Sequence, residues 1–232
     1  MSASSVAATI ADHAGAVGNY FGSVRVPASF LAGASFAGLF TLKPDVTRRT
    51  KTDKALQFIY HLAITLCFLL SVNTIIISTA ANTKSLYGGF DTMAESGYNL
   101  LNREFHYEFV STRWSFLVSL MSFLIATTGR FVYEFRLFTP SFDEPKSVQI
   151  KRKVMGTAVC LLMSSLLLHL LAFINSTLFC WNNLLDMTID LVKVIVKKGS
   201  WKKPLEPISI ALAISGIGLL AYSILFNKEK DA

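Results

Sequence analysis

The stretch NREFHYEFVSTRWSF, residues 102–116, places two Glu, two Arg, a His and a Trp at the start of a long apolar run. Ionisable side chains are rare in segments that cross a bilayer, and those that occur there commonly serve a function. Three uses are open. The stretch could form a catalytic or ligand site, line a permeation path, or moor a helix at the lipid surface.

One helical face begins in this stretch and continues into the apolar run. Its members recur at steps of three or four residues, which places them on one side of an α-helix. The face is acidic at its start and small or hydroxyl-bearing thereafter, a composition typical of close helix packing in lipid. We expect a neighbouring helix or a partner to cover it, with a polar path or ligand groove as the alternative. The face consists of Glu104, Glu108, Ser111, Ser115, Ser119, Ser122, Ala126 and Gly129.

A second set of residues marks both ends of the same run. Arg113 lies about two turns into the helix, on a different face from the serines. An Arg at this depth can extend its guanidinium to the interface, where Trp and Tyr are also enriched. At the far end, Arg130 and Glu134 are four residues apart and can pair. We expect interfacial anchoring by Tyr107, Arg113, Trp114, Arg130, Tyr133 and Glu134.

Three histidines lie in or beside apolar runs, and each is a candidate cofactor ligand: His169, His61 and His106. His169 shares a helical face with Ser165, Ala172 and Ser176, so we expect it to meet another helix and find a hydrogen-bond partner there. The sharper alternative is axial ligation of a tetrapyrrole, chlorophyll or haem, because an imidazole nitrogen binds metals well. Asn73 is a similar mid-run polar residue that needs an interhelical partner.

Catalytic signatures are absent from the sequence. It contains no HExxH, GxSxG or P-loop motif and no Glu-xx-His pair of the di-iron type. The three Cys, at 67, 160 and 180, lack CxxC spacing, which argues against a zinc site or a disulfide framework. No basic run with interleaved aromatics suggests nucleic-acid binding. We therefore predict a protein that is not an enzyme and holds no metal of its own.

Composition places the chain in a membrane. Of its 232 residues, 52% are hydrophobic and only 16% are charged, whereas soluble domains carry about 25% charged residues. We predict an all-α, polytopic helical bundle, formed by a single domain over 26–226 between a polar N-terminal segment, 1–25, and a polar tail, 227–232. Four apolar runs predict transmembrane helices at 56–81, 104–137, 152–181 and 207–226, and a fifth run, at 26–42, is barely long enough to span.

Two polar segments complete the predicted organisation. Residues 93–103 resemble a short surface helix. The segment 182–198 continues the fourth run with apolar residues at helical spacing and charged residues between them, which predicts an interfacial or partner-binding amphipathic helix. Loops 43–54 and 137–153 are basic, so the positive-inside rule places both on the cytoplasmic, stromal or matrix side. The side of loop 199–206 stays open.

Part of the sequence resembles the Orai calcium-channel family. The resemblance is carried by Arg25, the Ala- and Gly-rich first run, IIISTAAN at the end of the second run and HYE at the start of the third. It implies that the first helix lines a pore and ends in an acidic selectivity residue. The corresponding end here, GLFTLKPD, contains no Glu.

The third run also resembles an uncharacterised group of multi-helix membrane proteins from algae. The shared pattern is REF, EF, Arg, Phe, FL, Arg and EF, found here at 103–105, 108–109, 113, 116, 123–124, 130 and 134–135. This resemblance implies a photosynthetic source but no activity.

The predicted function is a non-enzymatic accessory or structural subunit of a larger membrane assembly, in a plastid thylakoid or another organellar energy-transducing membrane. A homo-oligomeric ion channel is the alternative, and a tetrapyrrole-binding membrane protein is a third possibility. The expected partners are membrane lipids and other membrane protein subunits, and not nucleic acid. The cofactor is left open, with chlorophyll or lipid as candidates.

Overall fold

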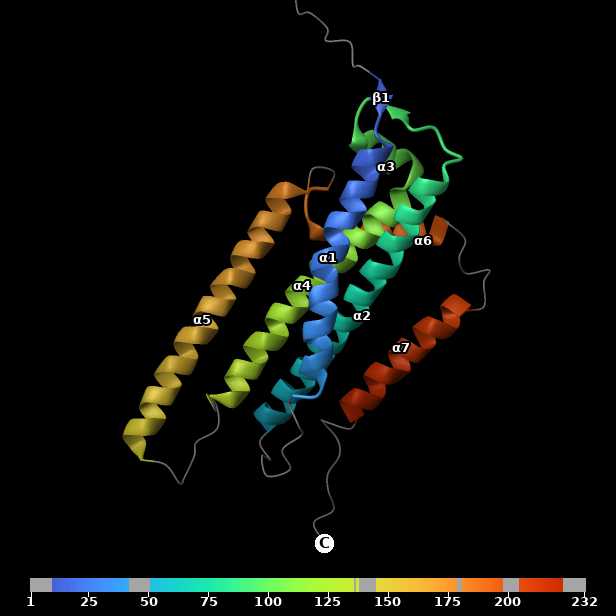
Figure 1. Ribbon diagram of the computed structural model, residues 1–232. Helices are drawn as coiled ribbons and strands as arrows, with labels where there is room; N and C mark the ends of the chain where they lie inside the picture. Colours follow the sequence, from blue (N-terminus) through green and yellow to red (C-terminus); the bar gives the residue numbers. More distant parts are fainter. Residues whose placement is uncertain are drawn as a thin grey trace, which may run out of the picture.

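The computed structural model describes residues 10–41, 51–135, 137, 145–178, 181–197 and 205–222. These residues form helices and one two-stranded antiparallel ribbon, so the predicted all-α class is confirmed (Figure 1). The helices are α1 (Ala14–Leu39), α2 (Lys51–Tyr87), α3 (Gly97–Glu104), α4 (His106–Glu134), α5 (Lys146–Thr177), α6 (Leu184–Lys197) and α7 (Leu205–Ala221), and the strands are β1 (Ala11–Asp12) and β2 (Met93–Ala94).

Three of the described helices are long and apolar enough to cross a membrane: Thr52–Tyr87 in α2, His106–Glu134 in α4 and Lys146–Thr177 in α5. They correspond to the runs predicted at 56–81, 104–137 and 152–181. As described, α1 and α7 do not meet these length and composition criteria.

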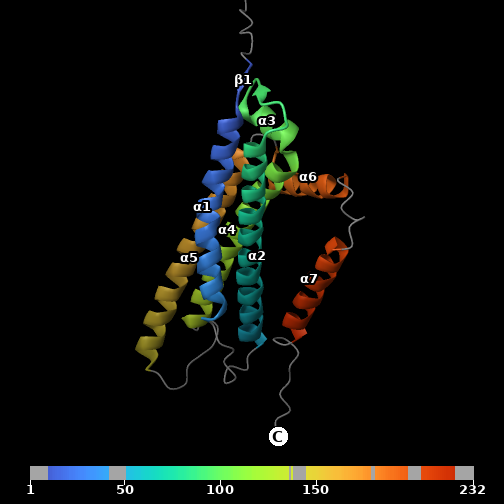
Figure 2. The same cartoon turned by 45° about the vertical axis from the view of Figure 1, so that its right-hand side comes forward.

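The bundle is centred on α1, α2 and α4, which lie side by side in both ribbon views (Figures 1 and 2). Small side chains let α2 and α4 approach closely. Several of their hydroxyls are satisfied within their own helices, as Thr74 Oγ1 donates to Leu70 O at 2.8 Å and Ser119 Oγ to Phe116 O at 2.8 Å. The helix interface therefore needs few bonds between helices.

A hydrophobic cluster, which we call the head cluster, lies toward the upper end of the bundle in Figure 1. It is formed by the start of α1, the first turns of α4, the ends of α2 and α5, and β2, α3 and α6. Gly88 and Gly89, with φ of 71° and 87°, turn the chain back after α2. The buried members of the head cluster are Val17, Phe21, Ala81, Ala94, Leu100, Leu101, Phe105, Phe109, Val110, Ile174, Leu178, Met187 and Leu191.

The head cluster corrects the predicted start of the first helix. Residues 14–25 were predicted as part of a polar N-terminal segment, but α1 begins at Ala14. Val17 and Phe21, one turn apart, are fully buried in the head cluster, and this burial stabilises helix outside the apolar run. Pro27 consequently lies inside the helix rather than in its first turn. Residues 1–9 and the predicted tail, 227–232, lie outside the described residues.

The surface helix and the third run, predicted at 93–103 and 104–137, are separate helices in the structure, and the break between them lies at Phe105. α3 ends at Glu104 and α4 begins at His106, because the fully buried Phe105 packs its ring against Phe21 and Phe90 at centroid distances of 6.0 and 5.1 Å. Lys84 Nζ donates to Glu104 O at 2.7 Å and so satisfies a carbonyl at this helix end. The predicted face is therefore not continuous, since Glu104 belongs to a different helix from the serines.

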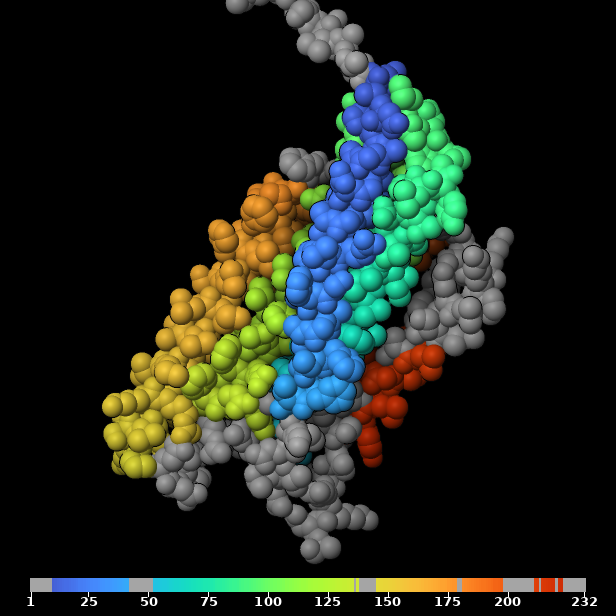
Figure 3. Space-filling model, viewed as in Figure 1, coloured from blue at the N-terminus to red at the C-terminus, as the bar shows by residue number. Residues whose placement is uncertain are grey.

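α5 lies at the side of the bundle and contacts α4 (Figure 1). Only 6% of its most apolar window is buried, against 33% for α2 and for α4. In the space-filling view, α4 is visible between α1 and α5, so α5 covers only part of α4 (Figure 3). The predicted continuation of this run, 182–198, is instead a separate helix, α6, which lies across the bundle (Figure 2).

Candidate functional site

Most of the polar residues predicted in the opening stretch lie around the junction of α3 and α4. Together with α2 and α6 they line an open cavity of about 410 Å³ next to the head cluster. The cavity is lined by Lys84, Arg103, Glu104, His106, Tyr107, Glu108, Val194 and Lys197.

The charged side chains in this cavity pair with one another. Lys84 Nζ is 3.8 Å from Glu108 Oε1 and lies 4.5 Å from the centre of the Phe105 ring. Arg103 contacts Glu104 Oε1 at 3.1 Å and Asp91 Oδ2 at 3.7 Å. Each of the two glutamates therefore faces a cation, and the arrangement fastens α2, α3 and α4 together at the helix break.

α6 is held against α4 by two polar contacts. Trp114 Nε1 donates to Thr188 Oγ1 at 2.8 Å, and His106 Nε2 is 3.7 Å from Asp190 Oδ2. Asp190 Oδ2 also accepts a hydrogen bond from Trp181 Nε1 at 3.1 Å. His106 and Trp114, predicted as a cofactor ligand and as a lipid anchor, both serve here to position α6.

Arg113 joins the ends of α4 and α5. Its guanidinium donates to Thr177 O at 3.0 Å and lies 5.9 and 6.0 Å from the ring centres of Phe109 and Trp181. Thr177 is the last residue of α5, so its carbonyl has no intrahelical donor. Arg113 therefore binds within the protein, whereas the sequence predicted a guanidinium directed to the lipid surface.

The hydroxyl of Tyr20, on α1 in the head, is buried and has no hydrogen-bond partner among the described residues. Burial raises the pKa of Tyr20 to about 12, and the Arg113 charge opposes this effect only in part. The phenol is therefore neutral at physiological pH.

Replacing Tyr20 with phenylalanine should leave the protein as stable at pH 7, or more stable by up to about 1 kcal/mol, because the lost hydroxyl makes no bond. In the wild type, the raised pKa means that stability should fall as the pH rises from about 10, the ordinary tyrosine value, through about 12. Y20F should lose less stability over this range. Unfolding curves in detergent between pH 7 and 12 would measure the free energy of unfolding of the wild type and Y20F, with Y87F, at an exposed site, as the control.

The serine face is buried between helices. Ser111, Ser115, Ser119 and Ser122 are all buried, and Ser115 Oγ accepts a hydrogen bond from Asn73 Nδ2 on α2 at 3.0 Å. In this chain the stripe therefore faces another helix rather than water. Asn73 has the interhelical partner that its mid-run position required.

The three candidate histidine ligands lie on three different helices. His61 Nδ1 is 2.8 Å from Gln57 O on α2, and His106 contacts Asp190. His169, on α5, is exposed and has no polar partner within the described part of the chain. The same part of the chain contains no group of three or more His, Cys, Asp or Glu side chains that could hold a metal ion.

A polar cluster at the lower end of the bundle was missed by the sequence analysis. Tyr133 is buried and its hydroxyl accepts from Gln57 Nε2 at 2.9 Å, while Tyr60 Oη donates to Gly38 O at 2.6 Å. The other predicted anchors are nearer the surface, with Arg130 donating to Thr41 Oγ1 at 3.2 Å and lying 3.9 Å from Glu134. Asp53, Gln57 and Tyr60 recur at helical spacing, a signal that could have identified this cluster.

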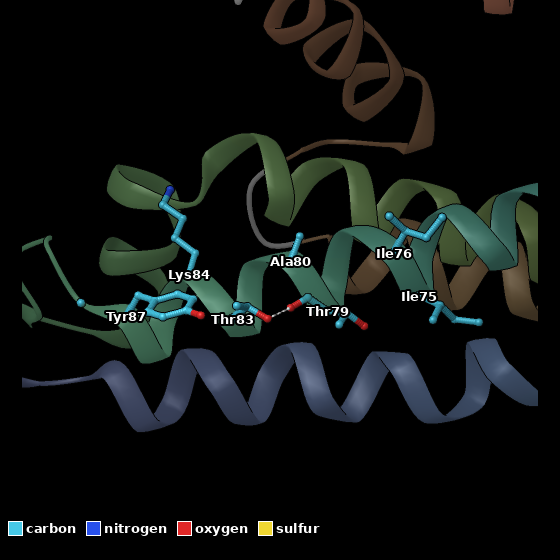
Figure 4. A pocket seen from close by; sticks show the side chains of 8 residues that line it. Ile75, Ile76, Thr79, Ala80, Thr83, Lys84 and Tyr87 are labelled. Atoms are coloured by element: carbon cyan, nitrogen blue, oxygen red, sulfur yellow. Dashed lines mark hydrogen bonds between the residues drawn. The ribbon is translucent and has the colours of Figure 1, made fainter.

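An open groove of about 730 Å³ runs along α2 (Figure 4). Its walls are mainly aliphatic, with the hydroxyls of Thr79 and Thr83 and the amine of Lys84 toward its upper end. Lys84 lines both the groove and the charged cavity. The groove residues are Ile75, Ile76, Thr79, Ala80, Thr83, Lys84, Tyr87 and Gly88.

Comparisons of the chain with models of protein families, with characterised proteins and with solved structures find no match.

Proposed function

We propose that this chain is a non-enzymatic accessory or structural subunit of a larger membrane protein assembly. The observation that carries the proposal is the outward-facing His169. It lies within the most apolar of the three candidate spans, α5, on an exposed face that also contains Ser165, Ala172 and Ser176. No described residue of this chain gives its ring a hydrogen-bond partner.

A histidine exposed to lipid in the middle of a spanning helix is unfavourable, because hydrocarbon cannot replace the hydrogen bonds that water gives the ring. Small neighbours such as Ser165 and Ala172 let a second helix approach closely. A helix of another subunit that covers this face would give the His169 ring a hydrogen-bond partner and would pack closely on the small residues. The paired charges of the head cavity agree with a structural role, because they fasten helices together.

In the proposed arrangement, α1, α2, α4, α5 and α7 all cross the membrane, while the head lies outside it. The basic residues of loops 43–54 and 137–153 favour the cytoplasmic, stromal or matrix side for the lower end. A plastid thylakoid, or another energy-transducing membrane, is supported by the resemblance of the third run to the algal group.

A photo-crosslinking amino acid at Leu162 would test the proposal in native membranes. Leu162 is 71% exposed and lies on the same side of α5 as His169, two turns away along the helix. Its neighbour Leu161 is 65% exposed but points about 100° away around the helix. We expect Leu162 to crosslink to a different membrane protein and Leu161 to lipid.

Other products would contradict the accessory-subunit proposal. Crosslinks from Leu162 to a second copy of this chain would favour the homo-oligomeric channel. A pigment absorption that disappears in H169L would favour tetrapyrrole binding. Lipid adducts at both positions would remove the reason to place a partner on this face.

A further inference from the structure

α6 carries a second apolar row that the protein leaves uncovered. Met187 and Leu191 are buried against the head cluster. Four further apolar residues follow at steps of three or four on another side of the helix, and all are more than half exposed. They are Leu185 at 72%, Ile189 at 52%, Val192 at 53% and Val196 at 56%.

The direction of this row follows from the head cavity. Val194 lines that cavity together with residues of the α3–α4 junction. At about 100° per residue, Val194 is about 140–180° around the helix from each member of the row. The row therefore points away from the head and back toward the level of the spanning helices.

The level of α6 coincides with the ends of two candidate spans. Thr188 is bonded to Trp114, near the start of the apolar part of α4, and α5 ends at Thr177, which is bonded to Arg113. Figure 2 shows α6 lying across the direction of α2 and α4. Trp114 and Trp181 belong to this level, and Trp is enriched at membrane interfaces.

Three charged residues of α6 occupy a third side. Asp186, Lys193 and Lys197 are centred about 90° around the helix from the middle of the apolar row, and Lys197 also lines the head cavity, while Asp190 is bound to His106 and Trp181. With α6 parallel to the bilayer and the row directed at the lipid, these charges would lie at the level of the headgroups and water. An interfacial amphipathic helix has this division into an apolar and a charged side.

We propose that α6 is an in-plane membrane-surface helix whose apolar row, Leu185, Ile189, Val192 and Val196, inserts into the boundary between headgroups and acyl chains. It would hold the head at a fixed height above the bilayer through the Trp114–Thr188 and His106–Asp190 contacts. The inference rests on the membrane placement in the proposed function, but it does not require a partner subunit.

Nitroxide labels on the full chain, reconstituted in phosphatidylcholine–phosphatidylglycerol vesicles, would test this inference. Single cysteines at Ile189, Val192 and Lys193 would be introduced after the native cysteines are replaced by serine. We expect the labels at 189 and 192 to be more accessible to oxygen than to a water-soluble nickel chelate, at a depth of about 5–10 Å. The label at 193 should show the reverse.

A label at Leu161, on the exposed side of α5, supplies the reference for the hydrocarbon. Chelate access at 189 and 192 equal to that at 193 would overturn the inference, because the row would then lie in water. So would exclusion of both reagents, which would mean that protein covers the row. Access of the chelate to a label at Leu161 would contradict the membrane placement itself. The absence of a protein crosslink at Leu162 would contradict the accessory-subunit proposal but not the inference about α6. Circular dichroism matching the unlabelled protein would confirm that each labelled chain is folded.

Discussion

Replacement of Arg113 with leucine should lower the free energy of unfolding by about 2–4 kcal/mol, because a charged hydrogen bond and its aromatic contacts are lost together. The Thr177 carbonyl would lose its donor at the point where α5 ends. The upper end of α5 and the adjacent α6 should therefore open more often. Denaturant unfolding in detergent would measure the stability, and amide hydrogen exchange would locate the opening.

Arg130 supplies the matched control at the other end of α4. It also donates a hydrogen bond and lies near a carboxylate, but its side chain is 43% exposed, and pairs of this kind contribute about 0–1 kcal/mol. R130L should thus have a small effect. R113K should recover only part of the loss, since an ammonium lacks the planar fork that donates and stacks at once. Equal effects of R113L and R130L would contradict the role assigned to Arg113.

The parts of the fold that depend on local sequence could be predicted. An apolar run of sufficient length forms a helix in a membrane whatever its neighbours are, because every backbone group must be satisfied within the segment. The three candidate spans follow from this rule. α6 could be recognised for a similar reason, since the alternation of its apolar and charged residues is a property of the segment alone.

The parts that depend on tertiary burial could not be predicted. A boundary between the surface helix and the third run was expected near 103, but its position at Phe105 depends on a ring that packs into the head cluster and on a lysine from α2 that reaches the freed carbonyl. The early start of α1 depends on the same cluster. In both places, the local sequence does not determine the exact residue at which the helix ends or begins.

In the candidate site, too, the local sequence indicates which side chains need a partner, whereas the tertiary structure decides which partner they find. Asn73 could be expected to need a partner on another helix, but its pairing with Ser115 depends on the register between α2 and α4. The acceptor of Arg113 is a backbone carbonyl that becomes available only where α5 ends. For His169, the sequence predicts a hydrogen-bond partner on another helix, but the described part of this chain supplies none.

Taken together, these contacts make α5 a helix that is attached near its ends and uncovered between them. Arg113 and the head cluster hold its upper end, and a close contact at Gly156 holds its lower part. The exposed face with His169 lies between these attachments. A subunit that offers one helix to a partner needs this kind of support, because the helix must stay in place while its outer surface remains available.

Gly156 is where the lower attachment should be most sensitive to substitution. A Cβ atom added to this residue would lie 2.6 Å from Phe135 Cβ and 2.7 Å from Leu137 Cδ2. Because Phe135 Cβ is bonded directly to the backbone, a change of rotamer cannot move it away. G156V should therefore push α5 off α4 and destabilise the protein by about 1–3 kcal/mol, the usual range for overpacking.

Gly33 provides the control, since it lies in α1 with no atom within 4 Å of an added Cβ. G33V should change stability by less than about 0.5 kcal/mol, as for other exposed sites. Spin labels at Ile125 and Lys153 should move apart in G156V and keep their separation in G33V. If α5 is the docking helix, G156V should also weaken the Leu162 crosslink. An unchanged label distance in G156V would mean that the lower contact does not position α5.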